Sequence, residues 1–354
     1  MIKNILIAGG AGFVGSNLAL NLKQELKGCR IICFDNLIRA GSELNIPRLE
    51  DCGITFIKGD IRNLQQLLDL PKIDLIVECS AEPSVLASYD NPSYTIETNL
   101  MGTLNCLELA RRDKSGFIFL STSRVYPVEQ VNNIPYEEQA TRFDWLKRAE
   151  GAGYSYRGVN LDFSLNGVKS LYGATKLSSE QLVLEFADMY SFKCAINRLG
   201  VIAGPWQMGK IDQGIVGYWM ARHKYRGALS YVGFDGLGKQ VRDIVHVDDV
   251  CALILYQINH LDGLDRKIFN AGGGRDNSVS LLELTDMVRK ITGNTIAIGS
   301  VRDNRKADIR IFIADNSAVS RETGWAPQKS IEDILVDVNQ WMDTHADELK
   351  GVLT

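Results

Sequence analysis

A glycine-rich turn near the amino terminus constrains the fold of this chain more than any other feature. Residues 9–15, Gly-Gly-Ala-Gly-Phe-Val-Gly, follow the apolar run 4–8 and lead into a segment with helix-spaced apolar residues. Glycines at such a turn let the backbone approach a pyrophosphate at the positive end of a helix. A tight turn without a ligand is the alternative, but the order strand, turn, helix favours a nucleotide site. We therefore assign to a cofactor site Gly9, Gly12, Phe13, Val14 and Gly15.

The first 200 residues alternate short apolar runs with helix-spaced patterns. The strand-like runs are 4–8, 30–35, 55–58, 75–79, 116–121 and 194–199, and the helical segments include 15–26, 99–111 and 172–190. This alternation predicts an α/β fold with a Rossmann-type doubly wound parallel sheet, whose ligands bind at the carboxyl ends of the strands.

The pattern changes after about residue 200. Glycine-rich irregular segments are mixed there with helical patterns near 279–292 and 330–345. We expect a smaller C-terminal α/β substrate-binding lobe that comprises mainly residues 200–354. The NAD-binding Rossmann domain is expected to span residues 1–199, with 240–272 returning to it.

The composition favours a small soluble substrate. The chain has 354 residues, 45% of them hydrophobic, and a formal net charge of −4 with a pI near 5.7, which disfavours nucleic acid as a partner. No apolar stretch is long enough to span a bilayer, so we expect no membrane partner. The 7 cysteines form no CxxC pair and no histidine cluster has metal-ligand spacing, which indicates reduced thiols, a cytoplasmic location and no metal site.

Acidic residues follow the second and third predicted strands. Asp35 closes an apolar run, where a carboxylate can accept hydrogen bonds from both adenosine ribose hydroxyls and repel a 2′-phosphate, so NAD is preferred over NADP. Asn36 follows it, and Arg39 is interpreted as a solvated loop residue. Asp60, with Ile61, is expected beside the adenine; a cap of the next helix is the alternative for Asp60.

A tyrosine and a lysine four residues apart form the candidate catalytic pair. On a helix, Tyr172 and Lys176 share one face, and the positive charge of the lysine favours a tyrosinate that can act as a base. A hydroxyl is also expected at the end of the strand near residue 120. Residues 121–126 supply several, and each could instead cap a turn.

Together these motifs resemble the extended short-chain dehydrogenase/reductases, the NAD-dependent epimerase/dehydratase family that acts on nucleoside-diphosphate sugars. The resemblance covers nearly the whole chain and includes residues 99–103, 241–249, 269–273 and 323–327. It implies that Thr122, Tyr172 and Lys176 are catalytic. It also implies that the cofactor contacts Ser80, Asn99, Tyr172 and Lys176.

Three further segments, 34–43, 212–214 and 238–243, are similar to members that invert C2 of a CDP-sugar. By this resemblance Arg242 and Arg305 bind the diphosphate, since a guanidinium pairs with phosphate oxygens through two hydrogen bonds. Surface ion pairs with Asp243 and Asp308 are the alternative. The other implied substrate-binding residues are Ser84, Thr122, Gln213 and Gln240. The resemblance further implies a role in lipopolysaccharide O-antigen biosynthesis and a homodimer or homotetramer.

The implied reaction is an epimerisation through a transient ketone. Tyr172 takes a proton from a sugar hydroxyl while NAD⁺ accepts hydride from the same carbon, which later returns to the opposite face. An epimerase acting at C4 of another nucleotide sugar and a 4,6-dehydratase are alternatives. Dehydratases usually carry acidic residues after the catalytic threonine, where this chain has Ser123 and Arg124.

A protein that binds NAD without turnover is a third possibility, which the presence of both Tyr172 and Lys176 disfavours. Three residues depart from the common family pattern and bear on which sugar is bound: Glu78, Glu82 and Val201.

Overall fold

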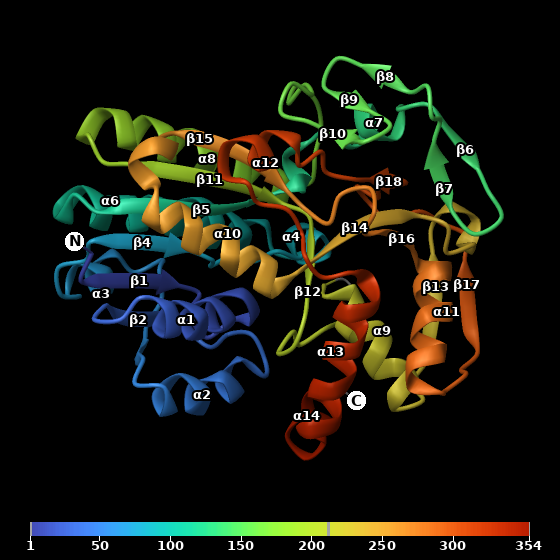
Figure 1. The fold of residues 1–354 in the computed structure, drawn as a ribbon, viewed down its shortest axis with the longest axis horizontal. Coiled ribbons are helices and arrows are strands. Elements are labelled where there is room, and N and C mark those ends of the chain that lie inside the picture. Colours follow the sequence, from blue (N-terminus) through green and yellow to red (C-terminus); the bar gives the residue numbers. More distant parts are fainter. Residues whose placement is uncertain (1, 211–212, 354) are drawn as a thin grey trace. The chain divides into compact units, whose positions relative to one another are not determined.

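The computed structural model describes residues 2–210 and 213–353, which form two compact units (Figure 1). The first unit contains the residues up to Thr122 together with 171–198 and 251–268. The second contains 123–170, 199–250 and the residues from Phe269 onward. These units do not test which region holds the cofactor and which the substrate, so that assignment stays a prediction.

A seven-stranded sheet in the order β3-β2-β1-β4-β5-β11-β15 organises the first unit, with the last strand leading into the second unit. The pairs β2–β3, β1–β2, β1–β4 and β4–β5 are parallel. The order reverses direction between β1 and β4, which confirms the predicted doubly wound fold. The strands are β1 (Asn4–Ala8), β2 (Arg30–Asp35), β3 (Thr55–Lys58), β4 (Leu75–Glu78), β5 (Gly116–Thr122), β11 (Cys194–Leu199) and β15 (Lys267–Ala271).

The three helical segments predicted in the first 200 residues are confirmed as α1, α6 and α8, and the first unit has further short helices that were not predicted from the sequence. The helices of this unit are α1 (Phe13–Glu25), α2 (Asn45–Asp51), α3 (Leu64–Leu68), α4 (Val85–Asp90), α5 (Pro92–Ile96), α6 (Gly102–Asp113) and α8 (Leu171–Tyr190). The helix α10 (Val247–Asn259) begins in the second unit and continues in the first. A π-helical turn, Glu97–Met101, precedes α6, so the expected continuous helix from residue 99 is interrupted at its start.

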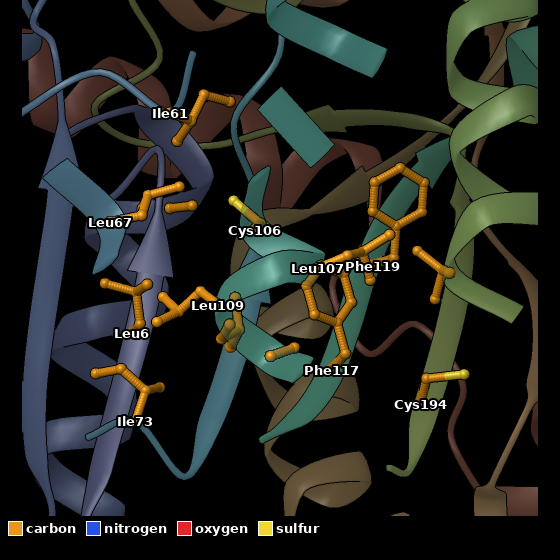
Figure 2. Packing of buried hydrophobic residues seen from close by; sticks show 14 of the residues in the cluster. Leu6, Ile61, Leu67, Ile73, Cys106, Leu107, Leu109, Phe117, Phe119 and Cys194 are labelled. Atoms are coloured by element: carbon orange, nitrogen blue, oxygen red, sulfur yellow. The ribbon is translucent and has the colours of Figure 1, made fainter. Parts of the chain in front are cut away.

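The core of the first unit lies between the sheet and the helices α6 and α8. The side chains of Leu6, Leu107, Leu109, Phe117 and Phe119 are buried there (Figure 2). All residues of β4 and β11 are buried, as expected for strands covered on both faces. This packing holds β4 and β5 in place, and with them the carboxyl ends of the two strands.

The second unit contains small sheets and a separate set of helices. The helices are α7 (Val128–Asn132), α9 (Ile215–Lys224), α11 (Leu281–Thr292), α12 (Ser317–Thr323), α13 (Ile331–Thr344) and α14 (Ala346–Leu353). The central strands are β12 (Val201–Ala203), β14 (Val241–His246), β16 (Ser278–Ser280) and β18 (Ile311–Phe312). The remaining strands are β6 (Tyr136–Glu138), β7 (Phe143–Trp145), β8 (Glu150–Gly151), β9 (Tyr154–Ser155), β10 (Gly158–Val159), β13 (Leu229–Val232) and β17 (Ile298–Val301).

The predicted helices near 279–292 and 330–345 are confirmed as α11 and α13, and both begin with a capping box. In the part of the chain that the structure describes, every helix is too short or too polar to cross a membrane.

We predict that Leu107→Ala lowers the free energy of unfolding by about 2–5 kcal/mol, because it opens a cavity beneath the sheet where Leu107 is fully buried. Urea denaturation followed by circular dichroism measures the loss. The matched control is Met189→Ala, also on a helix of the first unit but 63% exposed, which should change stability by less than about 0.5 kcal/mol. Equal losses in the two variants would contradict the assigned core.

Candidate functional site

The glycine turn between β1 and α1 has no room for side chains at Gly9, Gly10 and Gly15. Gly9 has a φ of 75°, and a Cβ there would lie 2.8 Å from the backbone of Ser80. A Cβ on Gly15 would lie 2.2 Å from the carbonyl oxygen of Gly9. Gly12 is the N-cap of α1, and among the described residues no side chain caps the helix there. The turn therefore fits a ligand pyrophosphate, which the first amides of α1 can bind.

Asp35, the last residue of β2, is held beside this turn. Its Oδ2 accepts a hydrogen bond from the amide of Ala11 at 3.1 Å, and its Oδ1 accepts one from the amide of Leu37 at 2.8 Å. Burial raises the pKa of Asp35, and the backbone amides partly offset this effect. The carboxylate thus ends the strand at the position where a Rossmann fold binds the adenosine ribose.

Asn36 and Asp60, both assigned to the cofactor site from the sequence, are brought together. The Nδ2 of Asn36 donates to Oδ2 of Asp60 at 3.1 Å. Hydrogen bonds from Arg62 lower the pKa of Asp60 to about 2. The alternative that Asp60 caps the next helix is wrong, because Asn63 is the N-cap of α3 and accepts from the amides of Gln65 and Gln66. Asp60 and Arg62 also line a surface hollow together with residues of α3.

Ile61, by contrast, is buried and packs where α6 begins. A Cβ on Gly102 would lie 2.4 Å from the Cδ1 of Ile61, so the Ile61 side chain packs directly against the backbone of α6 at this glycine. The side-chain amide of Asn105 donates to the Ile61 carbonyl at 2.8 Å. Ile61 therefore ties the loop after β3 to α6.

Asn99 lies in the π-helical turn and connects two elements of the site. Its Oδ1 accepts from the amide of Glu82 at 2.7 Å, while its Nδ2 donates to the Glu82 carbonyl at 3.1 Å and to Oγ1 of Thr175 at 3.2 Å. Its carbonyl accepts from the hydroxyl of Ser179 at 3.0 Å. Asn99 thus joins the loop after β4, which carries Ser80, to the helix that carries Tyr172.

Tyr172 and Lys176 occupy the first two turns of α8. Tyr172 is half-buried, whereas Lys176 is 2% exposed, with its Nζ 3.9 Å from the ring centroid of Phe119 on β5. A cation above an aromatic ring is attracted by the electrons of that ring, which fixes the direction of the side chain. Burial lowers the pKa of Lys176, and the nearby carboxyl groups of Glu78 and Glu180 oppose this shift.

Thr122 ends β5, and the neighbouring Ser121 has a structural role. The hydroxyl of Ser121 donates to Oε1 of Glu180 at 2.5 Å, and Glu180 forms a buried ion pair with Arg198 at 2.8 Å. Ser121 is thereby removed from the candidates for the catalytic hydroxyl. Thr122 is buried at the carboxyl end of the strand, where a Rossmann fold binds its ligands.

Ser84 is buried and serves as the N-cap of α4. Its Oγ accepts from the amide of Ala87 at 2.9 Å, and its own amide donates to Oε1 of Glu82 at 2.9 Å. The Ser84 hydroxyl oxygen already accepts this capping hydrogen bond, so in the predicted substrate contact the hydroxyl would act as the donor.

In the second unit, Arg242 on β14 lies near another arginine. Its guanidinium approaches Oδ1 of Asp308 at 3.4 Å and donates to the carbonyl of Val241 at 2.8 Å. Burial, with the charge of Arg124, lowers the pKa of Arg242 to about 10. Two neighbouring guanidiniums favour an anion between them. The effect of Arg124 on Arg242 was not predicted from the sequence, because the two residues are far apart along the chain.

Three other predicted substrate residues belong to the same unit. Arg305 is half-buried in the loop after β17. Gln240 is buried and donates from Nε2 to the carbonyl of Val232 at 2.8 Å, while its Oε1 has no hydrogen-bond partner among the described residues. Gln213 is half-buried and forms backbone hydrogen bonds with Lys210. Residue 212, part of a segment used in the resemblance, lies outside the described residues.

A family model and several known proteins match most of the length of this chain. The profile of the NAD dependent epimerase/dehydratase family matches residues 5–157 and 160–272. CDP-paratose 2-epimerase of Salmonella typhi is 31% identical over 345 residues, covering 95% of this chain and 98% of that protein. UDP-glucose 4-epimerase of Erwinia amylovora is 28% identical over 359 residues, covering 96% and 97%.

Solved structures with the same fold include two epimerases. UDP-glucose 4-epimerase of Thermotoga maritima with UDP-glucose has a TM-score of 0.78 and 26% identity, with 97% of this chain and 100% of that chain covered. UDP-glucuronic acid 4-epimerase of Bacillus cereus, with UDP-glucuronic acid and NAD, has a TM-score of 0.79 and 25% identity, with 97% and 99% covered.

We predict that Gly15→Ala weakens NAD⁺ binding at least about tenfold, because the added methyl group displaces the backbone of the turn. Isothermal titration calorimetry measures the affinity. Gly263→Ala is the control, since an added Cβ there meets no atom of the described residues within 4 Å. Unchanged affinity in the folded Gly15→Ala variant would show that the cofactor does not bind at this turn.

Proposed function

Because the chain belongs to the NAD dependent epimerase/dehydratase family, we propose that it is a nucleotide-sugar epimerase with Tyr172, Lys176 and Thr122 as catalytic residues. The observation that carries this proposal is the placement of Tyr172 and Lys176 on successive turns of α8, with the ammonium buried over Phe119. A base and a fixed positive charge are the groups that removal of a proton from a sugar hydroxyl requires.

NAD is the cofactor of this family, and the expectation of NAD from the sequence is confirmed. The residues at the amino end of α1 and Asp35 fit it, as the close approaches at Gly9 and Gly15 indicate. When bound, NAD⁺ supplies reversible two-electron oxidation and reduction of a sugar carbon.

Residues of the chain remove the proton from the sugar hydroxyl and later return it. The phenolate oxygen of Tyr172 removes the proton from the hydroxyl of the reacting carbon. That carbon becomes a ketone because its hydride would be lost in the two-electron oxidation that NAD⁺ supplies when bound. The ammonium of Lys176 stabilises the phenolate, and the hydroxyl of Thr122 donates a hydrogen bond to the sugar oxygen. After the ketone has rotated in the site, so that its opposite face is the one reduced, the phenol of Tyr172 returns the proton to the sugar oxygen. The stereocentre is inverted and no group is lost.

We further propose that the substrate is CDP-paratose and that C2 is inverted to give CDP-tyvelose. The support is the 31% identity with a CDP-paratose 2-epimerase over nearly the whole length of both chains. Arg242 and Arg124, with Arg305, supply the positive charge that a diphosphate requires. The Oε1 of Gln240 is buried and has no hydrogen-bond partner among the described residues. It is therefore suited to accept a hydrogen bond from the substrate.

The test is proton NMR of CDP-paratose incubated with purified protein without added cofactor. We predict a new anomeric signal from CDP-tyvelose, and a loss of at least about 100-fold in rate for Tyr172→Phe, which removes the base and leaves the ring in place. Tyr190→Phe, at the other end of α8, is the control and should retain the rate.

Two outcomes would overturn the proposal. No change of CDP-paratose by folded, NAD-loaded protein, with turnover of UDP-glucose instead, would replace the C2 reaction by a C4 epimerisation. Loss of water from the sugar would identify a dehydratase.

A further inference from the structure

A buried glutamate lies beside the catalytic lysine. Glu78, the last residue of β4, is fully buried and pairs in register with Phe119 on β5. Side chains of directly paired residues on parallel strands point to the same face of a sheet. Since Nζ of Lys176 lies over the ring of Phe119, Glu78 faces the same region as the ammonium.

The hydrogen bonds of Glu78 accommodate two protonation states. Its Oε1 lies 2.9 Å from Oγ1 of Thr103, which in turn lies 2.7 Å from the carbonyl oxygen of Asn99. The hydroxyl of Ser80 also donates to this Oε1, at 3.5 Å. The Thr103 hydroxyl has one proton and the carbonyl can only accept. When Thr103 donates to Asn99, its contact with Glu78 requires a protonated carboxyl group; when it donates to Glu78, the carboxylate is accommodated.

The other oxygen of Glu78 is also buried. Its Oε2 has no hydrogen-bond partner within the described residues 2–210 and 213–353. A buried carboxylate in this state is costly unless a positive charge compensates it. Lys176 is the cation that acts on Glu78 across this space.

Among the carboxyl groups that support the charge of Lys176, Glu78 has the larger effect and Glu180 the smaller. Glu180, one turn along α8 from Lys176, is already neutralised by Arg198 and accepts a hydrogen bond from Ser121. Among the described residues, the other titratable groups near the pair are Tyr172, one turn before Lys176 on α8, and the buried thiols of Cys79 on the loop after β4 and Cys106 on α6, whose pKa values are raised by burial. Burial also raises the pKa of Glu78 to about 7, against the opposing charge of Lys176.

We propose that Glu78 is a positioning residue whose carboxylate keeps Lys176 charged and directed over Phe119. The proposal rests on the function proposed above for the role of Lys176 in the reaction. It assigns a task to a residue that the sequence marked only as a departure from the family pattern.

Glu78→Gln tests the proposal, because the amide keeps the size of the side chain and resembles the protonated carboxyl group that the site already accommodates. Without the carboxylate, Lys176 should lose its proton more easily. We expect the alkaline limb of the kcat/KM profile to move down by about one pH unit or more, with KM at neutral pH changed less than about twofold. Glu78→Asp, which keeps the charge, should restore most of the profile.

Glu108→Gln is the matched control, since Glu108 lies on α6 in an ion pair with Arg111 at the surface. Its profile should match the wild type. An alkaline limb in Glu78→Gln that coincides with that of the wild type would overturn the proposal.

A second measurement needs no turnover. In a double-mutant cycle, Glu78→Gln and Lys176→Met are made singly and together, and the Tm of each protein is measured at pH 8. Coupling predicts that the Tm changes of the single variants fail to add, by more than about 2 °C. Additive changes would overturn the pairing. If the wild type converts no nucleotide sugar, the proposed function fails while this cycle still decides whether Glu78 and Lys176 interact.

Discussion

The burial of one positive charge is the constraint on which the rest of the site depends. The ammonium of Lys176 is removed from water at the carboxyl end of a parallel sheet, where it would be costly without compensation. The ring of Phe119 lies beneath it, and the carboxyl group of Glu78 faces the same space. The contacts of Asn99 with Thr175 and Ser179 hold α8 at this place. The helix that carries the base is therefore positioned by polar contacts as well as by the apolar core.

The sequence predicts most of the fold because local periodicity determines it. The run Asn4–Ala8 and the glycine turn after it carry their own signals, and the helix from Leu171 to Tyr190 follows the spacing of its apolar residues. The position of Asp35 at the end of β2 was predicted for the same reason. These features depend on neighbours in sequence, so a single chain is enough to find them.

The contacts that refine the site depend on residues distant in sequence. The choice of Thr122 over Ser121 came from resemblance, and the structure adds a physical reason, because Glu180 already binds the Ser121 hydroxyl. The π-helical turn at Asn99 and the approach of Arg124 to Arg242 have no local signature. The helix cap that was the alternative role for Asp60 is made by Asn63 instead. Both residue types are common helix caps, so the sequence alone does not distinguish them and the structure is needed.

The proposed chemistry predicts where the hydrogen on the inverted carbon comes from, and this tests the account most directly. The reaction should be run with CDP-paratose in D₂O and the product analysed by NMR and mass spectrometry. Inversion by oxidation and reduction within the site predicts that C2 of the product keeps its original hydrogen without solvent deuterium. Deuterium at C2 would indicate inversion by exchange with solvent, and deuterium elsewhere on the sugar would indicate elimination of water. Either result would contradict an epimerase that works through Tyr172 and a cofactor retained in the site.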